Sequence, residues 1–522
     1  MSGRRSLLER WVERRFGGYL HQLNAVRTDR PLRLQQPRST AVVGGGLAGL
    51  TAACLLAERG FRVALFERND YLGGKVGSWP VSLEGGFRTR VEHGFHAFFR
   101  QYHNLRRFLS ALGVQQRLIP IEDYRIDTLT RGSTSFQGIR TTPVLNMLSM
   151  ARKGVYRLGE VARNPASRRL LDLLTYDPEK TFARYDHTSF REFAEAIGLP
   201  PSLRIVFTTF ARAFFAESHH MSMAEMIKSF HFYFLSNDLG LIYDVLDDDF
   251  ELTLLAPVRR FLEKRGAEIH TGCPVERLQR AGSGFAVADR VFDALVLATD
   301  VRAARGIAEA SPFLAAEDPV LHRRLASLQP SRPYAVLRLW LDRPLPRTVP
   351  FFLFTDRVRV LDSISSYHHL EASSAAWARE TGGGIFELHS YALPDDLTEP
   401  GSVRTQLLEE LYLYMPELKP ARVLHEYLQV RDDFTAFHTG LHAERPEPRT
   451  GIPGLVLAAD WVKIPCPAML MEAAATSALL AANELLEAEG LRQEPVYSVP
   501  LRGLFARGPR GPGCRESGFQ PQ

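Results

Sequence analysis

Residues 39–67 read STAVVGGGLAGLTAACLLAERGFRVALFE, which is typical of a strand, a glycine turn, a helix and a second strand in succession. Within this stretch Gly44, Gly46 and Gly49 stand in the spacing G-x-G-x-x-G. The first glycine permits a tight turn, the second lets the backbone approach a pyrophosphate, and the third lets the helix lie close to the strand. The turn therefore predicts a site for the phosphates of a dinucleotide.

The residues on either side of the turn support the same prediction. A helix over residues 47–59 would place its free N–H groups and the positive end of its dipole beside the phosphates. The second strand, residues 62–66, ends at Glu67, 21 residues after Gly46, where a carboxylate can accept hydrogen bonds from ribose hydroxyls. A glycine turn without a ligand would not require the strand, the helix, the second strand and the acid to coincide.

A second glycine turn follows at Gly73, Gly74 and Lys75. It can bring backbone N–H groups and a cation towards the same phosphates. A nicotinamide-dependent dehydrogenase has no need of this second turn, so its presence favours FAD as the cofactor. The alternative interpretation is an ordinary surface hairpin.

Later segments return to the nucleotide-binding pattern. Residues 256–271 predict a helix and a strand, and residues 294–300 predict a buried strand. Residues 454–463 predict one more buried strand with Asp460 at its carboxyl end, followed by a long helix of small residues to about residue 487. The N-terminus of that helix suits a flavin, because the reduced ring carries negative charge near N1 and the C2 oxygen.

Together these elements predict an α/β fold, in which a Rossmann-like FAD-binding domain is interleaved with an α+β substrate-binding domain. The FAD-binding domain is expected to be discontinuous and the helical part of the substrate domain to face a membrane. The expected boundaries are 1–38 for a basic amphipathic segment and linker, 39–125, 250–330 and 450–490 for the FAD-binding domain, 126–249 (mostly helical) and 331–449 for the substrate domain, and 491–522 for a disordered basic tail.

The bulk composition excludes several classes of protein. With 522 residues, 45% apolar and 24% charged, the chain is neither disordered, fibrous nor a multi-span membrane protein. Residues 1–38 carry +6 and residues 499–522 carry +3, so the net charge of +5 leaves about −4 on the body, which argues against a nucleic-acid partner. The four cysteines are scattered without metal-ligand spacing, which suits a reducing compartment.

The basic N-terminal segment predicts a membrane interaction. Residues 7–16 can form an amphipathic helix with an arginine-rich face, which could lie in a membrane interface or pack on the body or on a second subunit. No window is long and apolar enough to span a membrane, and the twin arginines Arg4 and Arg5 lack the apolar region of an export signal. We therefore expect a cytoplasmic protein, peripheral on the inner face of the membrane.

Two stretches predict a pocket. Residues 91–105 alternate polar and aromatic side chains around a glycine, and Glu92, His93 and His96 are candidates for acid–base or positioning roles, although each could be structural. No carboxylate or cysteine follows at ligand spacing, so no metal site is expected. Residues 126–249 are crowded with aromatic side chains, which suits a tunnel for a long apolar ligand.

The motifs in this order resemble the FAD-dependent amine oxidase/phytoene desaturase superfamily. Within it, residues 73–79 and 92–99 resemble the carotene desaturases of the ζ-carotene and phytoene type. The longer run EHGFHAFFRQYHN at residues 92–104, with residues 460–462 and 471–476, is most similar to the isorenieratene synthases, which desaturate a carotenoid β-ring and move a methyl group to give an aromatic ring.

The resemblance implies a set of contacts and a reaction. Its FAD contacts would be Gly44, Gly46 and Gly49 on the pyrophosphate, Glu67 on ribose, Gly74 and Lys75 near the phosphates, Val275 on adenine, Asp460 on the pyrophosphate–ribityl region and Met471 on the pyrimidine edge. Many members have arginine where this chain has Lys75. Hydride loss from a bound carotenoid to the flavin would leave a cation that loses a proton, with Glu92, His93 or His96 assisting. A quinone or oxygen would reoxidise the flavin.

Three other functions stay open from the sequence. The chain could be an acyclic carotene desaturase or carotene isomerase, an amine oxidase on the same fold, or a non-catalytic FAD-binding protein. The end group of the substrate, the electron acceptor and the oligomeric state cannot be read from the residues.

Overall fold

The computed structural model describes residues 7, 10–11, 20–121, 123–130, 132–345, 349–504 and 506. Most of the N-terminal helix expected over residues 7–16 lies outside these residues, as does the end of the tail. Of the described part of that segment, the side chains of Leu7 and Trp11 are exposed. No helix of the described chain is both long and apolar enough to cross a bilayer.

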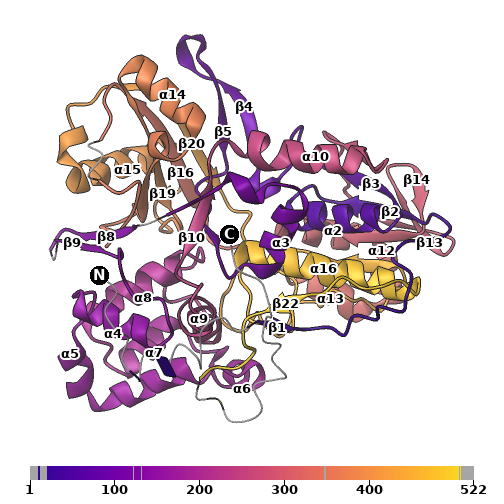
Figure 1. Ribbon diagram of the computed structural model, residues 1–522, viewed down its shortest axis with the longest axis horizontal. Helices are drawn as coiled ribbons and strands as arrows, with labels where there is room; N and C mark the ends of the chain where they lie inside the picture. The colour runs from indigo at the N-terminus through magenta and orange to yellow at the C-terminus, as the bar shows by residue number, and fades with distance from the viewer. Residues whose placement is uncertain are drawn as a thin grey trace.

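A five-stranded parallel sheet forms the centre of one half of the molecule (Figure 1). Its strand order is β11–β3–β2–β15–β21, and each adjacent pair is parallel. The strands are β2 (Ser39–Val43), β3 (Arg62–Phe66), β11 (Glu268–His270), β15 (Ala294–Leu297) and β21 (Leu455–Leu457). The short apolar runs form strands buried on both faces, as parallel strands between two helical layers should be. The α/β fold is therefore confirmed.

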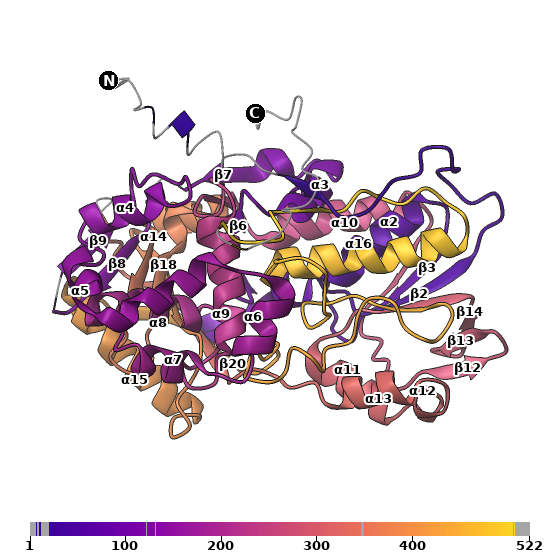
Figure 2. The ribbon, with the colours of Figure 1, turned by 90° about the horizontal axis from the view of Figure 1, so that it is seen from below.

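Two layers cover this sheet, because alternate side chains point to opposite faces. On one face Val42 and Val296 pack with the helices α2 (Leu47–Glu58), α10 (Ala256–Glu263) and α16 (Leu470–Ala488). The other face packs against a layer that holds α11 (Val301–Glu309), α12 (Pro312–Glu317), α13 (Pro319–Ala326) and the antiparallel strands β12 (Gln279–Ala281), β13 (Gly284–Val287) and β14 (Arg290–Phe292). Figure 2 shows the two layers above and below the strands.

A seven-stranded mixed sheet forms the second half, with the order β20–β16–β19–β18–β17–β8–β9. Its strands are β8 (Arg125–Thr128), β9 (Gly132–Ser135), β16 (Tyr334–Leu341), β17 (Phe352–Thr355), β18 (Ser363–Ser366), β19 (Gly384–Ser390) and β20 (Val423–Arg431). The apolar face of β16 and β19, which includes Leu337 and Leu388, packs with side chains of α15 (Pro400–Tyr414). α14 (Ala372–Thr381) lies near the other end of this sheet (Figure 1).

A group of helices below the seven-stranded sheet in Figure 1 comes from the region expected to be mostly helical. They are α4 (Leu145–Arg152), α5 (Leu158–Arg163), α6 (Pro178–Tyr185), α7 (Phe190–Ala196), α8 (Pro201–Arg212) and α9 (Met223–Phe230). Ser189 and Glu192 form a capping box that begins α7. The region is not purely helical, because its first strands, β8 and β9, join the seven-stranded sheet and β10 (Tyr243–Leu246) pairs with β6 (Phe98–Phe99) and β7 (Leu118–Pro120).

The end of the chain departs from the sequence-based expectation. Residues 491–522 were expected to be a disordered tail, yet β22 (Tyr497–Ser498) pairs with β1 (His21–Gln22). The backbone of Tyr497 also exchanges hydrogen bonds with the side chain of Asn104, at the start of α3 (His103–Ala111). Glycine, proline and arginine counts alone could not reveal this long-range pairing.

Candidate active site

One continuous cavity of about 830 Å³ runs between the two sheets. At one end it is lined by the glycine turn and by the carboxyl ends of the parallel strands. At the other end it is lined by aromatic and aliphatic side chains, which include Phe136, Met150, Val206, Phe210 and Phe234. Ligands of open α/β sheets bind at the carboxyl ends of the strands, so this cavity is the candidate active site.

A different steric reason explains why each position of the turn is a glycine. At Gly44, where φ is +108°, an added Cβ would collide with the carbonyl oxygen of Ala298. At Gly49 an added Cβ would collide with the carbonyl oxygen of Gly44, so the helix could not lie as close to the strand. Gly46 is different, because no described atom lies within 4 Å of the position that its Cβ would take. That open space lies in the cavity, where a bound phosphate needs close access to the backbone.

The acidic end of β3 is held in a fixed orientation. Glu67 accepts hydrogen bonds from the N–H of Gly45 at 2.7 Å and from the N–H of Asn69 at 2.9 Å. The carboxylate, only 5% exposed, lines the cavity and keeps lone pairs for further donors. Val275 lines the same end of the cavity, at the place where adenine was expected.

Lys75 and Asp460 meet in the cavity wall. The Lys75 ammonium lies 2.9 Å from Asp460 Oδ2 and 4.5 Å from the centre of the Phe434 ring, while the Thr435 hydroxyl donates to Asp460 Oδ1 at 2.9 Å. Burial would lower the pKa of Lys75, but the negative charges of Asp460, Asp433 and Asp300 together outweigh burial and raise the pKa. A β-bridge joins Gly46 to Gly73, so the two glycine turns lie side by side. Lys75 is therefore a fixed cation beside both turns.

The geometry fits FAD. The N-termini of α2 and α16 reach the cavity through Leu47 and Met471, and no described side chain caps either helix. In the described part of the chain, the buried hydroxyl of Thr299 lines the cavity without any hydrogen-bond partner. Two uncapped helix ends and an unpaired donor are what a pyrophosphate and a flavin ring require. The residues that would hold the cofactor are Gly44, Gly46, Gly49, Glu67, Gly74, Lys75, Val275, Asp460 and Met471, and each contact stays a prediction.

Past the cofactor end, a buried polar group lines the cavity. The Tyr334 hydroxyl donates to Asp433 Oδ1 at 2.8 Å and accepts from His93 Nε2 at 2.6 Å. Burial lowers the pKa of His93, so the ring is neutral and carries its hydrogen on Nε2. Burial would raise the pKa of Asp433, but His93, Lys75 and the Tyr334 hydroxyl together hold it low, which keeps the carboxylate charged.

His96 presents a lone pair. Its Nδ1 lies 2.7 Å from the carbonyl oxygen of Gly94, which can only accept, so Nδ1 carries the hydrogen and Nε2 is unprotonated. Burial, assisted by the neighbouring His93, lowers the pKa of His96 to about 4. The ring lines the cavity as a neutral imidazole at neutral pH.

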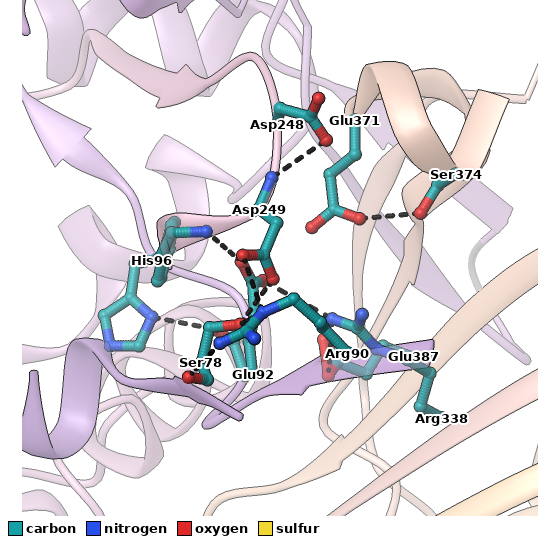
Figure 3. Close-up of polar contacts among 12 residues, drawn as sticks. Ser78, Arg90, Glu92, His96, Asp248, Asp249, Arg338, Glu371, Ser374 and Glu387 are labelled. Atoms are coloured by element: carbon teal, nitrogen blue, oxygen red, sulfur yellow. Dashed lines mark hydrogen bonds and ion pairs between the residues drawn. The ribbon is translucent and has the colours of Figure 1, made fainter. Parts of the chain in front are cut away.

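Glu92 does not line the cavity, unlike the two histidines. Its carboxylate lies 3.4 Å from the Arg338 guanidinium and accepts from the N–H of Phe250 at 2.9 Å. Figure 3 shows the group around it, which we call the buried acidic cluster: Glu92, Arg338, Glu371 and Glu387. Burial and the charge of Glu371 raise the pKa of Glu92 well above its usual value, so a proton is held within the cluster.

The aromatic residues of the helical region divide into two groups. Those expected to form a tunnel were Phe190, Phe193, Phe207, Phe210, Phe214, Phe215, Phe230, Phe232, Tyr233 and Phe234. Of these, Phe210, Phe214, Phe215, Tyr233 and Phe234 line the cavity. The others are buried among one another and form core packing. Side-chain spacing along a helix could not separate the two groups, because both lie on apolar faces.

Several cavity residues were not found from the sequence. Tyr334, His389, Tyr391 and Asp433 all line the cavity. Tyr334 lies on β16, His389 lies on β19, and Tyr391 follows β19 directly. The pairing of β16 with β19 brings these three residues together. The only local signal was the i, i+2 spacing of Glu387, His389 and Tyr391, which places them on one face of a strand.

Comparison with known proteins identifies the family. A family model described as flavin containing amine oxidoreductase matches residues 47–486. A carotenoid phi-ring synthase of Streptomyces griseus is 38% identical over 477 residues, which cover 90% of this chain and 91% of the relative. A zeta-carotene desaturase of Synechocystis sp. is 27% identical over 254 residues, which cover 46% of this chain and 50% of the relative.

Solved structures agree on the architecture. Cyclohexylamine oxidase from Brevibacterium oxydans superposes with a TM-score of 0.61 at 13% identity, which covers 86% of this chain and 99% of that one. This similarity concerns the fold, which is that of a flavin enzyme, and FAD is therefore the cofactor. The chain belongs to the flavin-containing amine oxidoreductase family and is an FAD-dependent oxidoreductase.

Proposed function

We propose that the protein desaturates the ring end group of a carotenoid, with migration of a methyl group, to give an aromatic ring. One observation carries this proposal: a single cavity joins the dinucleotide turn to a wall of aromatic and aliphatic side chains. Such a wall suits a long hydrocarbon better than a small polar substrate. The extent of the similarity to a phi-ring synthase supports the ring as the reacting part.

Bound FAD would supply the two-electron acceptor for a hydride from the substrate. The protein contributes an apolar cavity lining that excludes water and a fixed distribution of charge. His93 and His96 are neutral and lack a permanent positive charge that would oppose a substrate cation.

Glu92 acts at a distance in this proposal. The buried acidic cluster holds one guanidinium and three carboxyl groups, of which two lie within hydrogen-bonding reach of each other. Even when that pair shares one proton, the cluster keeps a net negative charge. A negative charge behind the residues that line the cavity stabilises a positive charge that develops inside it. Glu92 is therefore a positioning residue and not a group that touches the substrate.

Feeding experiments test the proposal. A host that makes β-carotene and expresses the protein should accumulate a carotenoid with an aromatic ring, identified by mass and absorption spectrum. A host that makes only lycopene should show no new product. Conversion of lycopene with β-carotene untouched would contradict the ring assignment.

An acyclic carotene desaturase is the second candidate, because the similarity to a zeta-carotene desaturase extends over almost half of this chain. The lycopene arm of the same experiment, extended to less desaturated acyclic carotenes, decides between the two. Rapid bleaching of the flavin by a polyamine without any lipid would instead indicate an amine oxidase. A flavin that neither carotenoids nor amines reduce would indicate a non-catalytic role.

Peripheral membrane association on the cytoplasmic side is part of the proposal, since a carotenoid resides in the bilayer. Leu129 and Leu148 are exposed, and they lie in the same segments as Ile126 and Met150, which line the cavity. We propose that this side of the helical region meets the membrane and that a quinone or oxygen reoxidises the flavin. Co-sedimentation with liposomes that contain anionic lipid tests the association, and loss of binding in L129E/L148E is the expected result.

A further inference from the structure

A third imidazole, that of His389, lines the cavity and was not among the expected site residues. It lies on β19, only 3% exposed. Glu387 lies two residues earlier on the same strand, so both side chains project from the same face of the sheet. The Glu387 carboxylate lies 3.5 Å from His389 Nε2, and Nε2 has no hydrogen bond to any described group.

The register of the sheet fixes this pair in place. Val336 of β16 pairs with His389, and Arg338 pairs with Glu387. The Arg338 guanidinium lies 3.4 Å from Glu387. Burial would raise the pKa of Glu387, but Arg338, His389 and the Tyr367 hydroxyl together outweigh burial and lower that pKa to about 2, so Glu387 is a carboxylate at neutral pH.

A carboxylate beside one ring nitrogen fixes the tautomer of a neutral histidine. His389 should therefore carry its hydrogen on Nε2, towards Glu387, and leave the lone pair of Nδ1 free. Gly94 makes room for this ring: a Cβ there would lie 3.2 Å from His389 Cε1, and φ of Gly94 is +139°. Both His389 and His96, whose lone pair was described above, border Gly94.

A buried carboxylate stands beside the ring of His389. The titratable or charged groups that face its ring are Glu387 on its own strand, Tyr391 two residues on, and His96 across Gly94, with Arg338 behind Glu387. Because Glu92 and Glu371 share a proton, the buried acidic cluster keeps about one uncompensated negative charge. The Glu387 carboxylate, 3.5 Å from His389 Nε2, is the counter-charge that a proton taken up by this ring would meet, whereas the Nδ1 hydrogen of His96 is directed to the carbonyl oxygen of Gly94.

We propose that His389 is the base that takes the proton from the carotenoid, with Glu387 and Arg338 as positioning residues. This inference rests on the proposed function. After a hydride has left for the two-electron acceptor FAD, which a quinone or oxygen reoxidises, the neighbouring carbon loses its proton to His389 Nδ1. The C–H bond breaks, its electron pair becomes the second bond of a new C=C, and the N–H bond forms. The proton leaves to solvent after the product has left.

The test is anaerobic, single-turnover formation of the desaturated product from β-carotene in detergent micelles, measured by rapid quenching across pH with FAD-loaded, full-length protein. The wild type should slow at acidic pH, because a protonated base cannot accept a proton. H389Q should slow the reaction at least tenfold and remove this acidic dependence. E387Q should slow it and shift the dependence to lower pH, and H96Q should keep it.

A matched control removes a buried histidine next to the same sheet. His368 is 8% exposed, lies outside the cavity lining and hydrogen-bonds to Ile385. H368Q should retain the wild-type pH dependence, which separates loss of a base from loss of packing. An H389Q protein that keeps the acidic dependence, or an H96Q protein that loses it, would overturn the assignment.

A second measurement needs no turnover. Two-bond ¹H–¹⁵N spectra of ¹⁵N-histidine-labelled protein, assigned by subtraction of H389Q, should show the Nε2–H form for His389, and E387Q should add the other tautomer. An Nδ1–H form in the wild type would overturn the inference alone. A wild-type flavin that no carotenoid reduces would overturn the proposed function, and the inference with it.

Discussion

Gly46 gives the sharpest single-residue test of the cofactor site. Its missing side chain faces open space within the cavity, so Gly46→Leu should leave the fold intact and fill the place of the pyrophosphate. We expect FAD binding to weaken at least tenfold, about 1.4 kcal/mol, with an unchanged far-UV circular dichroism spectrum. The ratio of bound flavin to protein measures this.

The control for Gly46 is Gly159, which also has no described atom near its Cβ position but lies on α5, outside the cavity lining. Gly159→Leu should bind FAD as the wild type does. Normal flavin content in Gly46→Leu would show that the phosphates lie elsewhere.

Glu371 predicts a pH dependence of stability. Burial raises the pKa of Glu371 to about 7, from an ordinary value near 4.5 in the unfolded chain. The folded state therefore holds a proton that the unfolded state has released, so stability is full below about pH 4.5 and is lost as pH rises towards about 7. Buried histidines with lowered pKa act in the opposite direction in the same window, so the effect is a difference between two proteins. From pH 4.5 to pH 7, the wild type should lose about 2–3 kcal/mol of unfolding free energy relative to Glu371→Gln.

Urea unfolding at a series of pH values measures the effect of Glu371. Glu380, exposed on the same helix α14, is the matched control, and Glu380→Gln should keep the wild-type profile. Parallel profiles of the wild type and Glu371→Gln would mean that Glu371 holds no proton in the folded state.

At the scale of elements, two motifs that are distant in the sequence explain each other. Glu472, in the first turn of α16, accepts from the N–H groups of Asn104 and Leu105 at 2.9 and 3.0 Å, and so caps α3. The Asn104 side chain also donates to Thr476 at 2.9 Å. One motif ends at Asn104 and the other contains Glu472, and both were interpreted from the sequence as marks of a family. The structure shows that together they connect α3 to α16.

Glu472→Ala should leave those two N–H groups without an acceptor and cost about 2–4 kcal/mol of stability. The amide protons of α3 should exchange faster with solvent, by hydrogen-exchange mass spectrometry. Glu484→Ala, on an exposed part of the same helix, should change stability by less than about 0.5 kcal/mol. Equal effects of the two substitutions would contradict the capping role.

The elements also show what a sequence can predict. Strand β3 and helix α2 were expected at residues 62–66 and 47–59 and lie at 62–66 and 47–58, because local apolar runs and glycines decide them. The parallel strand pairing follows from the crossover helix between them. The addition of β8 and β9 to the seven-stranded sheet depends on contacts with β17, more than two hundred residues later, and no local pattern encodes it.

The residues of the candidate site also divide into those that local motifs predict and those that depend on distant contacts. The expected cofactor residues Glu67, Lys75, Val275, Asp460 and Met471 all line one cavity, because each belongs to a motif with a fixed place at the sheet edge. His389 and Asp433 could not be found, since their neighbours in space come from other strands. Glu92 and His93 are adjacent in sequence yet face different environments, which shows why a motif alone does not identify a base.

At the scale of the whole molecule, FAD should act as a structural bridge. Its predicted contacts come from the start, the middle and the end of the chain, at Gly46, Val275 and Met471. FAD at one hundred times its Kd should therefore stabilise the fold by about 2.7 kcal/mol and raise the Tm of the entire protein in a single transition. FMN, which lacks the adenosine half, should raise it less, and an equal shift with FMN would contradict an extended dinucleotide.

The position of β21 at the edge of the parallel sheet has a consequence for biosynthesis. This strand and α16 complete a pocket whose first wall, the glycine turn, is synthesised long before either of them. A nascent chain can therefore form the whole flavin site only after α16 has emerged from the ribosome. Until then the apolar interior of the pocket stays incomplete, so the apoprotein must form before the flavin binds.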